Sequence, residues 1–142
     1  MKKVFLVGDF DSNTGPSIAN INLLKGLNKE NIPVLHTKGK TKLYRIFELY
    51  QGIKKSDIIC FCSFSKINKI GIKKAKKLNK RIVYLLHGAI AFEKNIENTN
   101  GRVFSKKIDP LEKYIYDNVD QIICVSKKAM DLAVLSMETL NK

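Results

Sequence analysis

The stretch VGDFDSNTGPSIANINLLKGL, residues 7–27, joins an apolar run to a helical pattern through a small polar loop. Residues 3–7, which lead into this stretch and end at its first residue, are nearly all apolar, as expected of a parallel strand that is covered on both faces. Beyond the loop, apolar residues recur at three-residue steps from Pro16 to about Lys29, which predicts a helix capped by Thr14. The predicted inward stripe of this helix consists of Ile18, Ile21, Leu24 and Leu27. The stretch therefore predicts a strand, a turn and a helix.

The same unit repeats along the rest of the chain. Further strands are predicted over residues 32–37, 57–64, 81–88 and 121–126. Further helices are predicted over residues 43–53, 66–79, 110–120 and 127–141, the last one capped by Ser126. Five apolar strands that alternate with helices predict a Rossmann-like α/β fold, a doubly wound parallel sheet with helices on both faces. We expect the strand order 3-2-1-4-5, with residues 1–142 forming a single domain.

The composition is that of an ordinary globular protein. Hydrophobic residues make up 44% of the 142 residues, which is enough for one core. No apolar run approaches the roughly 20 residues that a membrane-spanning helix needs. Asp9 and Asp11 follow the first strand too closely for a signal-peptide core to form. We therefore expect a cytoplasmic protein.

The formal net charge of +13 comes almost wholly from lysine. Lysine clusters favour anionic membranes or nucleic acid, because they gain from approaching acidic lipid or from releasing counterions. Arginine, which phosphate and base-edge recognition favours, is confined to three positions: Arg45, Arg81 and Arg102. Two interpretations stay open, solvated lysine faces and a basic surface that meets a membrane. No base-reading motif is present, so we expect no specific nucleic-acid partner.

The predicted helix over residues 66–79 is rich in lysine. Its apolar residues are predicted to face inward: Ile67, Ile70, Ala75 and Leu78. Its basic residues are predicted to face largely outward: Lys69, Lys73, Lys76 and Lys77. These four lysines are the candidate membrane-facing residues.

Cysteine and histidine are scarce in the chain. Cys60 and Cys62 share one face of a predicted strand, and we expect them to be buried free thiols. The histidines are His36 and His87. These residues are too few to predict a metal centre, and we expect none.

Two loops are candidate ligand contacts. In an open doubly wound sheet, ligands bind beyond the carboxyl ends of the strands, where the strand order reverses. With the expected order, that crevice is bordered by the loops after the first and fourth strands, which carry GDFDSNTGPS and HGAIAF. Backbone N–H groups from Gly15 to Ser17 are expected to point outward at the helix start, where an anion can approach. His87 is expected to bind a sugar hydroxyl or a phosphate, or to transfer a proton.

Standard phosphate-binding motifs are absent. No G-x-G-x-x-G follows the first strand, and GKT at residues 39–41 lacks the preceding glycine of a Walker loop. Asp9 and Asp11 are interpreted as solvated loop acids rather than as a catalytic pair. Simpler interpretations also stay open, a tight turn before a helix for Gly15 and a histidine bonded to backbone for His87.

Three motifs together resemble a known family. TGPS after the first strand, YLLHG at the end of the fourth and DNVDQIICVSKKAMDLA around the fifth resemble the N-terminal half of GT-B fold glycosyltransferases of family 4. The likeness covers essentially the whole chain. It implies two Rossmann-like domains facing across a cleft, the N-terminal one receiving the acceptor and the C-terminal one binding most of a nucleotide-sugar. This chain corresponds to the N-terminal domain.

The resemblance also implies roles for individual residues. Gly15, Pro16 and Ser17 would lie near the donor diphosphate, and His87, which is followed by Gly88, would contact the transferred sugar. It implies no cofactor and, in most members, no metal. The acceptor would be a glycan or a lipid-linked molecule of cell-surface polysaccharide synthesis, with the domain peripheral at the inner face of the membrane. Because the sequence ends at Lys142, before a nucleotide-binding domain, we expect these residues not to catalyse transfer alone.

Two other functions stay open. SNTGPS approximates the hydroxyl-rich phosphate loop of flavodoxin-like proteins that bind flavin mononucleotide, through Ser12, Thr14 and Ser17. A basic nucleic-acid-binding domain is the alternative that the charge indicates. Bound flavin would colour the protein, whereas nucleic-acid binding would weaken steeply with salt.

Overall fold

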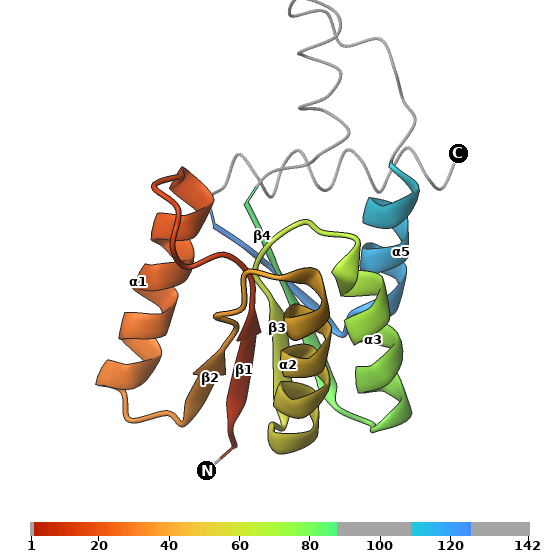
Figure 1. Cartoon of the computed structure of the whole chain (residues 1–142), viewed down its shortest axis with the longest axis horizontal. Helices are drawn as coiled ribbons and strands as arrows, with labels where there is room; N and C mark the ends of the chain where they lie inside the picture. Colours follow the sequence, from red (N-terminus) through yellow and green to blue (C-terminus); the bar gives the residue numbers. More distant parts are fainter. Residues whose placement is uncertain (1, 88–108, 126–142) are drawn as a thin grey trace, which may run out of the picture.

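The computed structural model describes residues 2–87 and 109–125, which form a parallel sheet covered by helices (Figure 1). The strands are β1 (Val4–Val7), β2 (Val34–His36), β3 (Ile58–Phe61), β4 (Arg81–Leu86) and β5 (Gln121–Cys124). The helices are α1 (Gly15–Lys29), α2 (Lys42–Lys55), α3 (Ile67–Lys77) and α5 (Pro110–Asn118). All strand pairings are parallel, which confirms the Rossmann-like α/β fold. The predicted last helix, residues 127–141, and its cap Ser126 lie outside the described residues.

The strand order is β2-β1-β3-β4-β5, so the expected order 3-2-1-4-5 is wrong. Val4 of β1 pairs with Val34 of β2 on one side and with Ile58 of β3 on the other. β3 therefore separates β1 from β4, which the expected order makes neighbours. The physical reason is burial. β3 is apolar on both faces and belongs inside the sheet, whereas β2 has three residues, all only partly buried, and suits an edge.

Helices cover the two faces of the sheet from opposite sides (Figure 1). On one face, α1 packs Leu23, Leu24 and Leu27 against a cluster that includes Leu6 and Cys60. The other face carries α2, α3 and α5, whose buried residues join a larger cluster: Leu49, Ile53, Ile72, Ala75 and Ile115. Neighbouring strand residues alternate between the two clusters, as expected of strands that are buried on both sides.

Two glycines bring helices close to the sheet. A Cβ atom at Gly52 of α2 would lie 2.3 Å from the Phe5 ring, and one at Gly71 of α3 would lie 2.8 Å from the Phe61 ring. Real side chains do not tolerate such distances, so only glycine allows these helices to approach β1 and β3 so closely.

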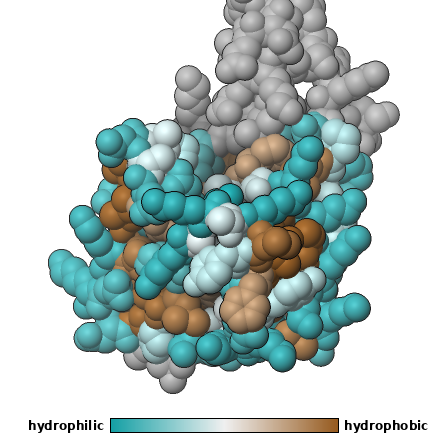
Figure 2. Space-filling view, viewed as in Figure 1, coloured by the Kyte–Doolittle hydropathy of each residue, from teal (hydrophilic) through white to brown (hydrophobic). Residues whose placement is uncertain are grey.

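Three apolar residues that the sequence places inward are exposed instead: Ile18, Ile70 and Leu78. The buried positions of α1 are Ser17 and Asn20, and those of α3 include Asn68 and Gly71. Small or hydrogen-bonded residues thus share the inward side of these helices with apolar ones, and Ile18, Ile70 and Leu78 turn outward. Apolar side chains also lie among hydrophilic ones on the outer face over α2 (Figure 2).

Cys60 and Cys62 are buried free thiols on one face of the sheet, as predicted, with 3.7 Å between their Sγ atoms. Within residues 2–87 and 109–125, no helix has the length and apolar character that crossing a membrane requires.

Candidate functional site

The candidate site lies at the carboxyl edge of the sheet, where the strand order reverses. β2 and β3 flank β1, so the reversal falls between β1 and β3. Open α/β sheets bind ligands in the crevice at such a point. The loops that border it follow β1 and β3, and not β1 and β4 as the expected order requires. His87, which follows β4, nevertheless reaches the crevice.

The imidazole of His87 bridges β3 and α1. Its Nε2 atom lies 2.9 Å from the backbone oxygen of Cys62 and 3.0 Å from Oδ1 of Asn20. Asn20 is fully buried in α1, and its Nδ2 donates to the backbone oxygen of Asp9 at 3.0 Å. A chain of hydrogen bonds therefore runs from the end of β4 to the loop after β1. It brings His87 against α1, the helix that Gly15 begins, although β1 and β4 are not adjacent.

These contacts decide which nitrogen of His87 carries a proton. The Nδ2 group of Asn20 is used as a donor to Asp9, so its Oδ1 faces the imidazole. Both neighbours of Nε2 are then acceptors, and Nε2 must carry the hydrogen. Nδ1 has no hydrogen-bond partner among the described residues, and in this tautomer it is a hydrogen-bond acceptor.

Asp9 organises the loop after β1. Its Oδ1 accepts hydrogen bonds from the backbone N–H of Asp11 at 3.0 Å and of Ser12 at 3.3 Å, and its Oδ2 accepts one from the Ser12 hydroxyl. The Ser12 hydroxyl, followed by the N–H of Asp11, holds the pKa of the Asp9 carboxyl below its ordinary value. Asp9 therefore acts as an acceptor inside its own loop.

The start of α1 offers fewer donors than the sequence indicates. Pro16 has no N–H, and the N–H of Ser17 donates to Oγ1 of the cap residue Thr14 at 3.3 Å. The side chain of Ser17 is fully buried. No described residue accepts from the N–H of Gly15, where the helix dipole has its positive end.

Gly15 is not required by packing. A Cβ atom added there would meet nothing within 4 Å, whereas one at Gly8 would lie 3.0 Å from Cβ of Cys62 and from Oγ of Ser63. Gly8 is therefore a packing glycine, and Gly15 borders open space that a ligand can enter.

A groove that sequence reasoning missed lies between the loops after β1 and β2. Its volume is about 390 Å³, and its lining includes Asp9, Ser12, Thr37, Lys38, Lys40 and Arg45. Oγ1 of Thr37 donates to the backbone oxygen of Gly8 at 2.7 Å and accepts from its N–H at 3.0 Å, which ties the two strand ends together. Glu48 of α2 accepts from the backbone N–H groups of Lys38 and Gly39. The sequence signal for this groove is the basic turn around GKT, residues 39–41. Its mismatch with a Walker loop gave no reason to expect a ligand there.

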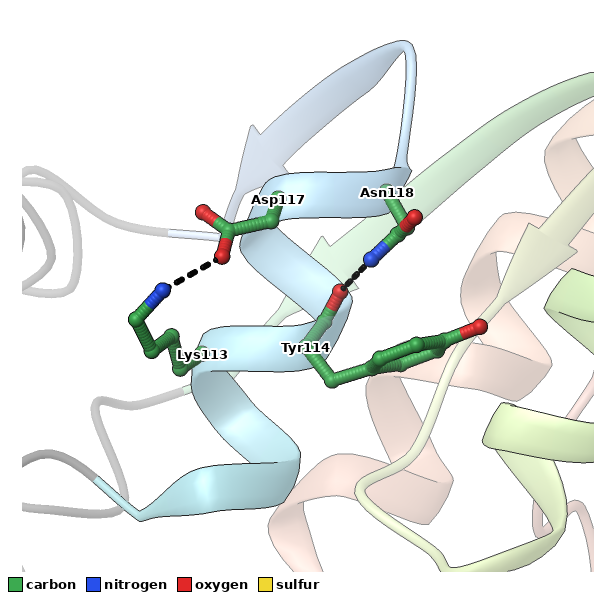
Figure 3. Close-up of polar contacts among 4 residues, drawn as sticks. All are labelled: Lys113, Tyr114, Asp117 and Asn118. Carbon is green, nitrogen blue, oxygen red and sulfur yellow. Dashed lines mark hydrogen bonds and ion pairs between the residues drawn. The ribbon is translucent and has the colours of Figure 1, made fainter.

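Two of the four candidate membrane-facing lysines contact α5. Nζ of Lys69 lies 5.1 Å from the centre of the Tyr114 ring, and Nζ of Lys76 donates to Oδ1 of Asn118 at 2.6 Å. Asn118 is oriented by its Nδ2, which donates to the backbone oxygen of Tyr114 (Figure 3). Tyr114 and Asn118, the residues that the two lysines contact, lie on the side of α5 away from the ion pair of Lys113 with Asp117 (Figure 3).

The remaining predicted site residues fall into two groups. Lys73 and Lys77 are exposed, as predicted. Gly88 lies outside the described residues, so its predicted contact with a substrate stays a prediction. In the part of the chain that the structure describes, no group of three His, Cys, Asp or Glu side chains is placed to hold a metal ion.

The fold defines a Rossmann-like α/β domain with a candidate site at the carboxyl edge of its sheet, and comparisons with known proteins make this more specific. The model of the family Glycosyltransferase Family 4 matches residues 15–135, and the chain belongs to this family. Among solved structures, the chain is similar to a CMP N-glycosidase of Clostridium botulinum, BcmB, with 17% identity and a TM-score of 0.52. That match covers 96% of this chain and 99% of the other, and it shows the fold alone. No curated protein matches the chain.

Proposed function

We propose that this chain is the acceptor-side domain of a GT-B glycosyltransferase, which transfers a sugar from a nucleotide-sugar to a glycan or lipid-linked acceptor. Family membership supports glycosyl transfer as the class of chemistry. The observation that carries the proposal is the placement of His87, whose Nε2 is held by Asn20 and Cys62 so that Nδ1 is left for a ligand. The donor would lie across the carboxyl edge, between this domain and a second one.

The groups at this edge suit a sugar diphosphate. In such a transfer the nucleoside diphosphate leaves through an oxocarbenium-like transition state, so positive groups near the diphosphate lower the barrier. The start of α1 supplies the positive end of a helix dipole and the N–H of Gly15. Nδ1 of His87 would accept a hydrogen bond from a sugar hydroxyl and fix the orientation of the sugar. Gly15, Pro16, Ser17, His87 and Gly88 are the proposed contacts, and neither a cofactor nor a metal enters the proposal.

A lipid-linked acceptor would hold the domain at a membrane. The net charge of +13 and the exposed lysines of α3 support contact with anionic lipid at the inner face. This part of the proposal places the protein in the cytoplasm, in the synthesis of a cell-surface polysaccharide.

NMR titration of the ¹⁵N-labelled chain with nucleoside diphosphate sugars tests the proposed contacts. Shift changes are expected at Gly15, at Ser17 and in the ring of His87. Gly15→Ala should weaken binding, because its methyl group enters the space that the diphosphate needs. Gly26→Ala is the matched control in the same helix, since a Cβ atom there also meets nothing within 4 Å. Equal binding by Gly15→Ala, Gly26→Ala and His87→Ala would show that the site is elsewhere.

A second candidate is hydrolysis of the N-glycosidic bond of a nucleoside monophosphate, in which water adds to the sugar carbon as the base leaves. The Asp9 carboxylate at the groove favours it, and the activity is the one named for the CMP N-glycosidase that shares this fold. It ranks second because that carboxylate already accepts hydrogen bonds from Asp11 and Ser12. Release of cytosine from CMP that disappears in Asp9→Asn would favour it over glycosyl transfer.

Flavin mononucleotide binding is disfavoured by the hydrogen bonds of the loop after β1. The strand order is the one that flavodoxins have. However, the donors that the phosphate of flavin mononucleotide would need from Asp11 and Ser12 are already bound to Asp9. The purified protein should therefore be colourless, and absorption by flavin in the visible range would contradict this.

A further inference from the structure

An apolar stripe runs along the outer face of α2. Leu43, Phe47 and Tyr50 are 83%, 60% and 38% exposed, and their spacing of four and three residues places them on one side of the helix. Contiguous exposed apolar patches on a globular domain mark surfaces that meet a partner or a membrane. Core packing therefore does not account for these side chains, and the stripe is a candidate contact surface.

The stripe continues onto α3. Nζ of Lys74 lies 5.5 Å from the centre of the Tyr50 ring, so the two helices meet at this level. Both helices run antiparallel to the parallel strands that they connect, so they run parallel to each other. Ile70, one turn before Lys74 and 38% exposed, is then level with Phe47. Leu43, Phe47, Tyr50 and Ile70 are called the α2–α3 surface below, and Figure 2 shows apolar side chains over this part of the molecule.

Positive charge surrounds the α2–α3 surface. Exposed or partly exposed lysines occur along both helices: Lys42, Lys54, Lys55, Lys73, Lys74, Lys76 and Lys77. α3 contains no Asp or Glu, and the one acid of α2, Glu48, is turned to the backbone N–H groups of Lys38 and Gly39. An occupant of this surface must therefore be apolar and carry negative charge.

We propose that the α2–α3 surface docks the domain onto an anionic lipid bilayer. The aromatic and aliphatic side chains enter the headgroup region, while the lysines keep their ammonium groups at the level of the lipid phosphates. A second copy of the chain is a poorer occupant, because a two-fold contact through this surface would bring lysines against lysines. The inference rests on the proposed membrane contact of the domain and not on sugar transfer. It moves that contact from α3 alone, where Lys69 and Lys76 reach toward α5, to α2 and α3 together.

Tryptophan fluorescence gives a direct test, because the chain contains no tryptophan. Phe47→Trp should shift its emission to shorter wavelength with vesicles of phosphatidylcholine and phosphatidylglycerol, and should not shift with phosphatidylcholine alone. Ile18→Trp is the matched control, since Ile18 is 52% exposed on α1, on the opposite face of the sheet. Equal shifts for the two variants, or equal shifts with neutral vesicles, would overturn the proposal.

Vesicle sedimentation with two pairs of variants separates the surface from the general charge. Leu43→Ser with Phe47→Ser, and Lys73→Glu with Lys74→Glu, should each lower binding to anionic vesicles by about tenfold or more. Ile18→Ser, and Lys25→Glu with Lys29→Glu, change the same residue types on α1. Each of these controls should leave binding within about twofold of that of the unchanged chain. Far-UV circular dichroism and thermal melting show that each variant is folded.

The outcomes distinguish the failure of this proposal from that of the proposed function. If the unchanged chain binds anionic vesicles but the α2–α3 and α1 variants bind alike, the assigned surface is wrong and membrane contact stands. If the unchanged chain does not bind, the assigned surface and the membrane contact are both wrong. The proposal of glycosyl transfer is not affected, because these experiments contain no sugar. A dimer that light scattering detects and that Leu43→Ser with Phe47→Ser dissociates would also overturn the proposal.

Discussion

Nε2 of His87 lies 3.0 Å from Oδ1 of Asn20, so the end of β4 is joined to the first half of α1. Asn20 is fully buried and is fixed by its own bond to the backbone of Asp9. The ring of His87 is therefore held in one orientation before any ligand arrives. Such preorganisation reduces the cost of ordering a binding group.

The first prediction concerns the tautomers of the two histidines. His87 should be protonated on Nε2 in its neutral form, because that atom faces two oxygens. His36 should be protonated on Nδ1, which lies 3.2 Å from the backbone oxygen of Thr37. Long-range ¹H–¹⁵N correlation spectra at alkaline pH distinguish the two forms. The same tautomer at both histidines would contradict the hydrogen bonding described here.

The second prediction concerns Gly8, which is packed against the end of β3. Gly8→Ala should lower the free energy of unfolding by about 1–3 kcal/mol, because its methyl group would overlap Cys62 and Ser63. Gly15→Ala is the control and should change it by less than about 0.5 kcal/mol, since that position is open. Urea unfolding measures both. Similar losses for the two variants would contradict the assigned packing.

The third prediction concerns the pH dependence of the loop after β1. The pKa of Asp9 is lowered from an ordinary value of 3.8, and the Ser12 hydroxyl is the largest cause. The folded state therefore favours the ionised form, and this stabilisation is present above the ordinary value and is lost as the pH falls through the lowered one. Ser12→Ala should raise the pKa of Asp9 toward its ordinary value, as measured by carboxyl ¹³C titration. An unchanged pKa would show that Ser12 does not hold the carboxylate.

The fourth prediction concerns the thiols. A hydrogen bond to Cys60, together with burial, raises the pKa of Cys62, and both residues are buried. Cys124 is partly exposed and should react first with a thiol reagent, although burial raises its pKa as well. In the Cys124→Ser variant, reaction should be slow until denaturant unfolds the chain. Rapid reaction of this variant in native buffer would show that the sheet is open at β3.

The sequence predicts the elements well because each strand and helix carries its own pattern. The apolar run before Gly8 and the Thr14-Gly15-Pro16 helix start are local signals, and α1 begins at Gly15 with Thr14 as its cap. The strand order is not a local property. It depends on which side of β1 pairs with β3. Cys60 and Phe61 are buried on opposite faces of the sheet, and an apolar run of this kind indicates an interior strand.

The site could be predicted only in part, for a related reason. His87 was found because a histidine ending a strand is a visible signal, whereas its partner Asn20 sits among apolar residues of a helix and gives none. The exposure of Ile18 and Ile70 could not be foreseen from periodicity, because Asn20 and Gly71 occupy the inward positions for reasons of hydrogen bonding and close approach.

The central claim is that the ring of His87 meets the sugar of a nucleotide-sugar, and intermolecular nuclear Overhauser effects test it most directly. With a bound nucleoside diphosphate sugar, the ring protons of His87 should show contacts to protons of the hexose, and His36→Gln should leave these contacts intact. Contacts from His87 to the nucleobase alone, or donor contacts confined to residues away from His87 and α1, would contradict the account.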